Sequence, residues 1–191
     1  MATAKEIFME LLSALPEDVP HIHESAWIDP KTVPFSADVR QMCADNRCGK
    51  YGSCWTCPPG CGDWEMLRDK YQAYKEAFVF TTCHELEDSF DFEGMQEAGA
   101  AHKRLDDLIA DKLGAFVGQY VHLGAGACGI CAKCTYPDAP CRFPERAMGS
   151  LEGYGIFVSE LANQAGVKYN NGPNTVTYFG ALICDGEIPE K

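Results

Sequence analysis

The chain has 191 residues, 46% of them hydrophobic, and a formal net charge of -12 at pH 7, so residues 1–191 can form a single domain with its own core. The acidic charge, with no basic stripe, argues against nucleic acid and anionic membrane surfaces as partners. No run approaches the roughly 18 apolar residues of a membrane span, and we expect a soluble, cytoplasmic protein.

An amphipathic helix is predicted at the start of the chain, within residues 1–15. Thr3 and Glu6 form a capping box before its apolar residues, and Pro16 ends it. Because the apolar side chains lie on one face, we interpret this segment as a docking helix. Residues 16–62 combine many prolines and glycines with cysteines, which predicts irregular backbone.

A strand, a long helix and a second strand are predicted in the middle of the chain. Asp63 is expected to cap a helix that leads to the first strand, at 77–82. The long helix spans 95–114 and the second strand 119–123. This order is typical of a parallel βαβ unit, so we expect the two strands to be parallel neighbours.

Three further elements are predicted toward the C-terminus. Pro144 suits the first turn of a helix that runs to about Tyr154. A short helix begins at Ser159 and is closed by Gly166. A last strand covers 175–184. Together the elements predict an α/β (or α+β) fold in which helices pack on a single sheet.

The chain contains 11 cysteines, an odd number, and a reducing cytosol keeps thiols free. Abundant free thiolates are typical of metal sites. The clearest group lies in a second cysteine loop, residues 126–145, with the spacing C-x2-C-x2-C-x6-C. Its members are Cys128, Cys131, Cys134 and Cys141.

The spacing of this group resembles that of a [4Fe-4S] cluster more than that of zinc. Zinc sites most often combine two C-x2-C pairs that are well separated in sequence. Three cysteines at steps of three can instead follow successive irons of a cubane. Gly124, Gly126 and Gly129 allow backbone N–H groups to point at sulfur. We therefore predict a [4Fe-4S] cluster at these four cysteines, with zinc as the alternative.

A first cysteine loop, residues 43–61, holds five cysteines, one more than a fully ligated cluster needs. Its members are Cys43, Cys48, Cys54, Cys57 and Cys61. A second [4Fe-4S] cluster is the preferred interpretation, and zinc is its main rival. The favoured ligands are Cys43, Cys48 and Cys57, with Cys61 or Cys54 as the fourth. A spare sulfur would be a redox-active thiol, or the cluster would keep an open iron.

Two histidines lie near the edge where ligands are expected. His84 follows Cys83 at the end of a strand, and His122 lies in the strand that leads to the second cysteine loop. Either can relay protons or bond to a sulfur, although a packed or surface histidine is the more frequent role. Cys83 and Cys184 end strands without partners in sequence and are interpreted as core thiols.

Three stretches of the chain carry a family resemblance. They are CGKYGSCWTCPP from Cys48, CGICAKCTYPDAPCRFPE from Cys128 and SLEGYGIFV from Ser150. These stretches resemble the DUF2284 family of predicted metal-binding proteins from anaerobic bacteria and archaea, over about Ile28 to Cys184. The resemblance implies metal, expected as iron-sulfur, and its pattern includes Cys43, Cys48, Cys57 and the four cysteines of the second loop. Cys54 departs from that pattern.

These features predict an iron-sulfur protein that passes single electrons to or from a redox partner protein in anaerobic metabolism. One alternative is an enzyme whose incompletely ligated [4Fe-4S] cluster acts as Lewis acid or sulfur acceptor on a small-molecule substrate. Another is a structural zinc-binding protein in which metal only holds the irregular loops together. The sequence carries no motif for hydrolysis or phosphoryl transfer.

Overall fold

The computed structural model describes residues 4–112 and 117–186. Its strands are β1 (Glu24–Ile28), β2 (Glu76–Glu85), β3 (Tyr120–Gly124), β4 (Gly149–Ser150) and β5 (Thr175–Cys184). Its helices are α1 (Ala4–Ser13), α2 (Ala37–Ala44), α3 (Trp64–Gln72), α4 (Phe92–Lys112) and α5 (Val158–Ala165). Short 3-10 turns lie at η1 (Pro30–Thr32) and η3 (Glu152–Tyr154).

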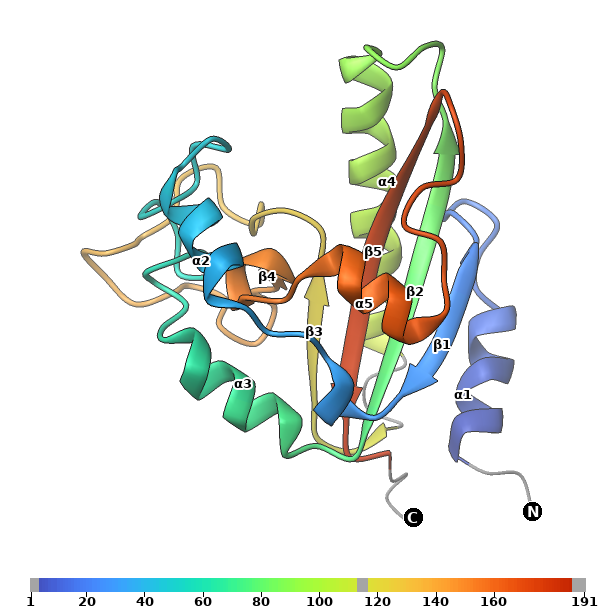
Figure 1. Ribbon diagram of the computed structural model, residues 1–191, viewed down its shortest axis with the longest axis horizontal. Coiled ribbons are helices and arrows are strands. Elements are labelled where there is room, and N and C mark those ends of the chain that lie inside the picture. The colour runs from blue at the N-terminus through green and yellow to red at the C-terminus, as the bar shows by residue number, and fades with distance from the viewer. Residues whose placement is uncertain (1–3, 113–116, 187–191) are drawn as a thin grey trace.

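The strands form one five-stranded sheet in the order β1-β2-β5-β3-β4, with helices on both faces (Figure 1). This confirms the predicted α/β class with a single sheet. The prediction that the strands at 77–82 and 119–123 are neighbours is wrong. They belong to β2 and β3, and each pairs antiparallel with β5, which lies between them. The two strands therefore run in the same direction without pairing, and only β3 and β4 form a parallel pair.

Alternate side chains of the central strands build two cores. On the face covered by α4 and α1, Phe78 and Leu182 pack with Leu105 and Ile109. Phe8 of α1 joins this core, with its ring centroid 5.1 Å from that of Phe78. Burial of such side chains supplies most of the free energy that holds a helix on a sheet. The apolar face predicted for the N-terminal helix is thus the face that packs against the sheet.

The opposite face of the sheet is covered by α5 and α3, and α5 crosses in front of the strands in Figure 1. Val79 and Ala181 contribute from the sheet, and Leu161 from α5. Gly166 ends α5 in the left-handed conformation, as predicted. Asp63 caps α3 by accepting a hydrogen bond from the Glu65 backbone N–H at 2.8 Å, also as predicted.

Two predictions of local structure need correction, and two others concern residues that the structure does not describe. Residues 16–62 are not irregular throughout, because they contain β1 and α2. The helix expected from Pro144 to Tyr154 is a turn followed by β4 and η3, since this segment pairs with the end of β3. The capping residue Thr3 and the stop signal Gly114 lie outside the described residues. No helix in the described ranges is both long enough and apolar enough to cross a membrane.

One buried histidine makes the stability of this fold depend on pH. His102 of α4 is 1% exposed, and burial lowers its pKa, although the nearby Asp106 opposes the shift. Because the folded state resists protonation below the ordinary pKa of about 6.5, the unfolded state takes up a proton that the native state does not. As far as His102 determines it, the free energy of unfolding is therefore highest above that pH and falls as the solution is acidified.

We expect the free energy of unfolding to drop between pH 7.5 and pH 5.5, by at most about 1.4 kcal/mol per pH unit for this one proton. Urea denaturation at both pH values measures the change. In His102→Gln the drop should shrink, whereas His21→Gln, which alters an exposed side chain, should keep it. Equal pH dependence in wild type and His102→Gln would contradict this assignment.

Candidate metal centre

The two cysteine loops lie beside each other at one end of the sheet, beyond β3 and β4 (Figure 1). The first loop begins in the last turn of α2, where Cys43 lies, and ends before α3. The second loop connects β3 to β4. Ser36 begins α2 by accepting a hydrogen bond from the Asp38 backbone N–H, and Asp63 begins α3. The capped helices thus fix where the first loop starts and ends.

Direct contacts join the two loops. The Trp55 indole N–H donates to the Ala139 carbonyl at 3.1 Å, and the rings of Trp55 and Tyr136 meet edge to face with centroids 4.9 Å apart. The Cys128 backbone N–H donates to the Thr56 hydroxyl at 3.4 Å. Because these contacts run between the loops, each loop depends on the other for its conformation.

The four cysteines predicted in the second loop line one pocket, and Cys54 of the first loop lines it with them. Trp55, Ile130 and Phe143 contribute apolar walls. Partial burial alone would raise the pKa of Cys134, but backbone N–H groups of Tyr136, Trp55 and Thr135, with the charge of Arg142, lower it. The surroundings of Cys134 therefore favour its thiolate, the form that binds metal.

The five thiols of the first loop lie near enough to influence one another. Burial raises the pKa of Cys57, and negative charge on Cys54, Cys61 or Cys48 raises it further. Burial also raises the pKa of Cys43, to which charge on Cys48 and Cys61 adds. So many thiolates cannot form together without positive charge among them. A bound cation or cationic metal core is the usual way in which proteins provide that charge.

Arg40 and η3 close the first loop from the side of α2. The guanidinium donates to the Cys61 sulfur at 3.3 Å, to the Gly153 carbonyl at 2.7 Å and to the Gly62 carbonyl at 2.8 Å. The Cys61 thiol donates to the same Gly153 carbonyl at 3.2 Å. Arg40 thus places a fixed positive charge beside a sulfur while it ties α2 to η3.

Replacing Arg40 by glutamine should lower the free energy of unfolding by roughly 1.5–3 kcal/mol, the range for hydrogen bonds made by a charged group. Urea unfolding of the variant and wild type measures the difference. Arg68→Gln is the matched control, because Arg68 pairs with the exposed Asp69 on α3 and such surface pairs contribute at most about 1 kcal/mol. Equal losses in the two variants would show that the Arg40 contacts contribute no more to stability than a surface ion pair does.

Sequence reasoning missed three features of this site. Neither Arg40 nor Thr56 carries a local sequence signal of its role. The cysteine spacing leaves open whether Cys54 is a ligand or a spare thiol, whereas in the structure it lines the second loop's pocket and its charge also affects Cys57 and Cys61 of the first loop. The stretch from Ser150 offered one signal, since its glycine at position 153 supplies the carbonyl that Arg40 and Cys61 share.

The donor set fits a soft, thiolate-bound metal or an iron-sulfur cluster. It consists of sulfur atoms in partly buried, mainly apolar surroundings, and thiolate ligands select zinc, copper(I) or iron-sulfur clusters. Within the described ranges, no group of three or more His, Cys, Asp or Glu side chains is arranged to hold one metal ion. Cys83 and Cys184, which were interpreted as core thiols, lie on β2 and β5, and Cys184 is fully buried.

A family model described as "Predicted metal-binding protein (DUF2284)" matches residues 26–184. No curated protein matches the chain, and no solved structure does. The matched range includes both cysteine loops and the η3 segment that packs against the first of them. The family description and the cysteines together support metal binding by this chain.

Proposed function

The chain belongs to DUF2284, a family of predicted metal-binding proteins, and from that premise we propose that its two cysteine groups hold [4Fe-4S] clusters and that it carries single electrons to or from a partner protein. The proposed ligands are Cys128, Cys131, Cys134 and Cys141 for one cluster and Cys43, Cys48, Cys57 and Cys61 for the other. Such clusters supply one-electron oxidation and reduction when bound.

The observation that supports this proposal is the segment from Cys54 to Cys57, which lies against both cysteine groups. Cys54 lines the pocket of the second group, its charge affects Cys57 and Cys61 of the first, and Thr56 accepts a hydrogen bond from Cys128. Because electron tunnelling falls steeply with distance, two redox centres that share one short segment suit intramolecular electron transfer. Two purely structural metals would not need this proximity.

The surrounding residues also suit an electron carrier. Arg40 donates to the Cys61 sulfur, and backbone N–H groups act on Cys134. Hydrogen bonds to sulfur stabilise the reduced, more negative state of a cluster and so raise its potential. Large apolar side chains are exposed on or beside the cysteine loops, which suits a docking surface for a partner. They are Met42, Tyr51, Phe143, Phe157 and Tyr169.

A redox titration tests this function. The anaerobically purified protein should take up about two electrons per chain from dithionite, give the EPR signal of reduced clusters, and return both on reoxidation. A protein that contains metal but accepts no electrons would overturn the proposal and favour a structural role.

A second candidate is an enzyme that uses an incompletely ligated cluster in the first loop. The first group has five thiols, and a groove lined by Met42, Cys43, Cys48, Phe157 and Tyr169 lies against it. An open iron beside such a groove would accept a small ligand. If added cyanide changes the EPR spectrum of the reduced protein, the enzyme is favoured; an unchanged spectrum favours the electron carrier.

A further inference from the structure

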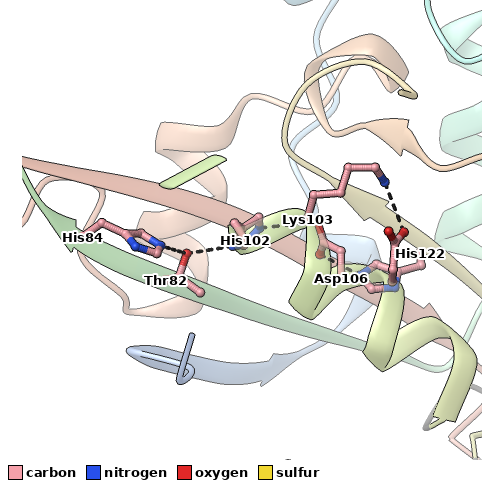
Figure 2. Close-up of polar contacts among 7 residues, drawn as sticks. Thr82, His84, His102, Lys103, Asp106 and His122 are labelled. Atoms are coloured by element: carbon pink, nitrogen blue, oxygen red, sulfur yellow. Dashed lines mark hydrogen bonds and ion pairs between the residues drawn. The ribbon is translucent and has the colours of Figure 1, made fainter. Parts of the chain in front are cut away.

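A chain of polar side chains is buried between α4 and the sheet (Figure 2). Thr82 is 0% exposed, His102 and Asp106 are each 1% exposed, and His122 is 7% exposed. His84, which is partly exposed, continues the chain toward the surface. The cysteine loops contribute none of these residues, so the chain is separate from the candidate metal centre.

The distances define which nitrogen faces which oxygen. His122 Nε2 lies 3.1 Å from Asp106 Oδ1, and His102 Nε2 lies 3.5 Å from Asp106 Oδ2. Thr82 Oγ1 lies 2.8 Å from His102 Nδ1, and His84 Nε2 lies 3.0 Å from Thr82 Oγ1. A carboxylate oxygen accepts hydrogen bonds, so the tautomer of a neutral His122 that satisfies this contact has its N–H at Nε2 and its acceptor at Nδ1.

The sheet makes room for this carboxylate. Gly180 of β5 and Gly124 of β3 both border Asp106, and a Cβ on Gly180 would lie 2.8 Å from Asp106 Oδ1. A side chain at either position would occupy the space that the carboxylate fills. The arrangement therefore places a buried carboxylate within hydrogen-bond distance of His122 and 3.5 Å from His102. Burying a carboxylate is costly unless it is hydrogen-bonded.

Two nitrogens of this arrangement are buried and have no hydrogen-bond partner among residues 4–112 and 117–186. They are His102 Nε2, which lies 3.5 Å from Asp106 Oδ2 without a hydrogen bond, and His122 Nδ1. A buried acceptor left unpaired is destabilising, and in native proteins a water or a bound group usually supplies the donor. His122 also lines a cavity.

The cavity has a volume of about 360 Å³, within the range of roughly 300–1,000 Å³ for small-molecule sites. It lies between α4, the outer edge of β3 and the turn before β4. Its charged lining consists of Asp107, Asp111, Glu145 and Arg146. Lys103 pairs with Asp107 at 3.1 Å. The excess of carboxylates disfavours an anionic occupant.

We propose that this cavity binds a small neutral or cationic molecule with an N–H or O–H donor, and that His122 Nδ1 accepts the proton of that donor. In this step the ligand's N–H or O–H bond breaks, its electron pair stays on the ligand, and an Nδ1–H bond forms. Asp106 stabilises the resulting imidazolium, as a carboxylate does for a histidine base.

The place of the cavity connects it with the cysteine loops without making it depend on them. Ala147 lines both this cavity and the pocket of the second cysteine group. A ligand at His122 would therefore lie next to that group, with the segment from Phe143 to Ala147 between them. The histidine, the carboxylate and the cavity do not depend on which metal the cysteines bind.

Histidine-selective ¹⁵N NMR of the anaerobically purified full chain tests the proposal. We expect His122 as the Nε2–H tautomer, with an unprotonated Nδ1 whose signal shifts saturably with propylammonium and not with propionate of similar size. Trifluoroethylammonium, a stronger acid of similar size, should protonate Nδ1. Asp106→Asn should lose this tautomer preference, because an amide can donate to Nε2.

Substitutions of exposed residues at the rim of the cavity test ligand binding without disturbing the buried residues that stabilise the fold. Asp111→Asn and Glu145→Gln alter exposed side chains and should each weaken propylammonium binding roughly twofold to fivefold, as expected for partly screened charges. His23→Gln, far from the cavity, should change nothing. Equal shifts with propionate, no shift with either probe, an Nδ1–H tautomer in the free protein, or propylammonium binding that leaves His122 unaffected would each overturn the proposal.

Discussion

Replacing Cys131 by serine should remove about half of the iron and sulfide that the chain binds, because the second cysteine group then has three thiolates for a cluster that takes four. A serine hydroxyl keeps its proton at neutral pH and is a poor ligand for iron in such clusters. Cys131 lines the pocket with the other cysteines of its group. Metal and acid-labile sulfide analysis of the anaerobically purified variant measures the loss.

Cys83→Ser is the matched control for this experiment. Cys83 lies on β2 and lines neither the pocket of the second group nor the groove beside the first. Its replacement should leave the iron content unchanged. If Cys131→Ser retained full iron and sulfide, or if Cys83→Ser lost as much, the assignment of ligands in the second loop would be wrong.

Gly60→Ala should disturb both cysteine groups at once. A Cβ at position 60 would lie 2.6 Å from the Cys54 carbonyl oxygen and 2.9 Å from Tyr136 Cε2. Neither neighbour can move freely, because one is backbone of the shared segment and the other packs on Trp55. We expect a loss of about 1–3 kcal/mol in the free energy of unfolding, as for overpacked sites, together with less bound metal.

Gly129→Ala provides the comparison. Gly129 stands inside the second cysteine group, yet a Cβ there would meet no atom within 4 Å, and its φ is not positive. This variant should retain its stability and its metal. Thermal unfolding and metal analysis of the two alanine variants distinguish two causes. One is the close contact between the loops at Gly60, and the other is a general sensitivity of the cysteine motifs to any glycine-to-alanine substitution. Equal losses of stability and metal in both variants would show that the contact at Gly60 is not the cause.

Local features of the sequence predicted much of the fold. The cap at Asp63, the stop at Gly166 and the apolar periodicity of α4 all depend on residues near in sequence, which is why they could be recognised. The position of β5 could not, because its insertion between β2 and β3 depends on pairing between distant parts of the chain. Pro144 misled for a related reason, since pairing with β3 replaced the helix that its position suggested.

In the candidate site, too, the features set by neighbouring residues could be predicted and those set by distant contacts could not. Cysteine spacing indicated which thiols gather in the second loop, because neighbours in sequence carry that signal. It could not indicate that Cys54 lies between the groups, or that Arg40 reaches Cys61, since these contacts depend on how the two loops pack. The link between His102 and Asp106 had a readable signal, an i,i+4 pair on one helix, whereas the contact with His122 required the sheet.

Metal and sulfide analysis of wild-type protein, purified without oxygen, is the decisive test of whether the cysteines hold iron-sulfur clusters. We expect about eight irons and about eight acid-labile sulfides per chain, shared between the two cysteine groups. Zinc without acid-labile sulfide, in protein that has never met oxygen, would contradict this expectation.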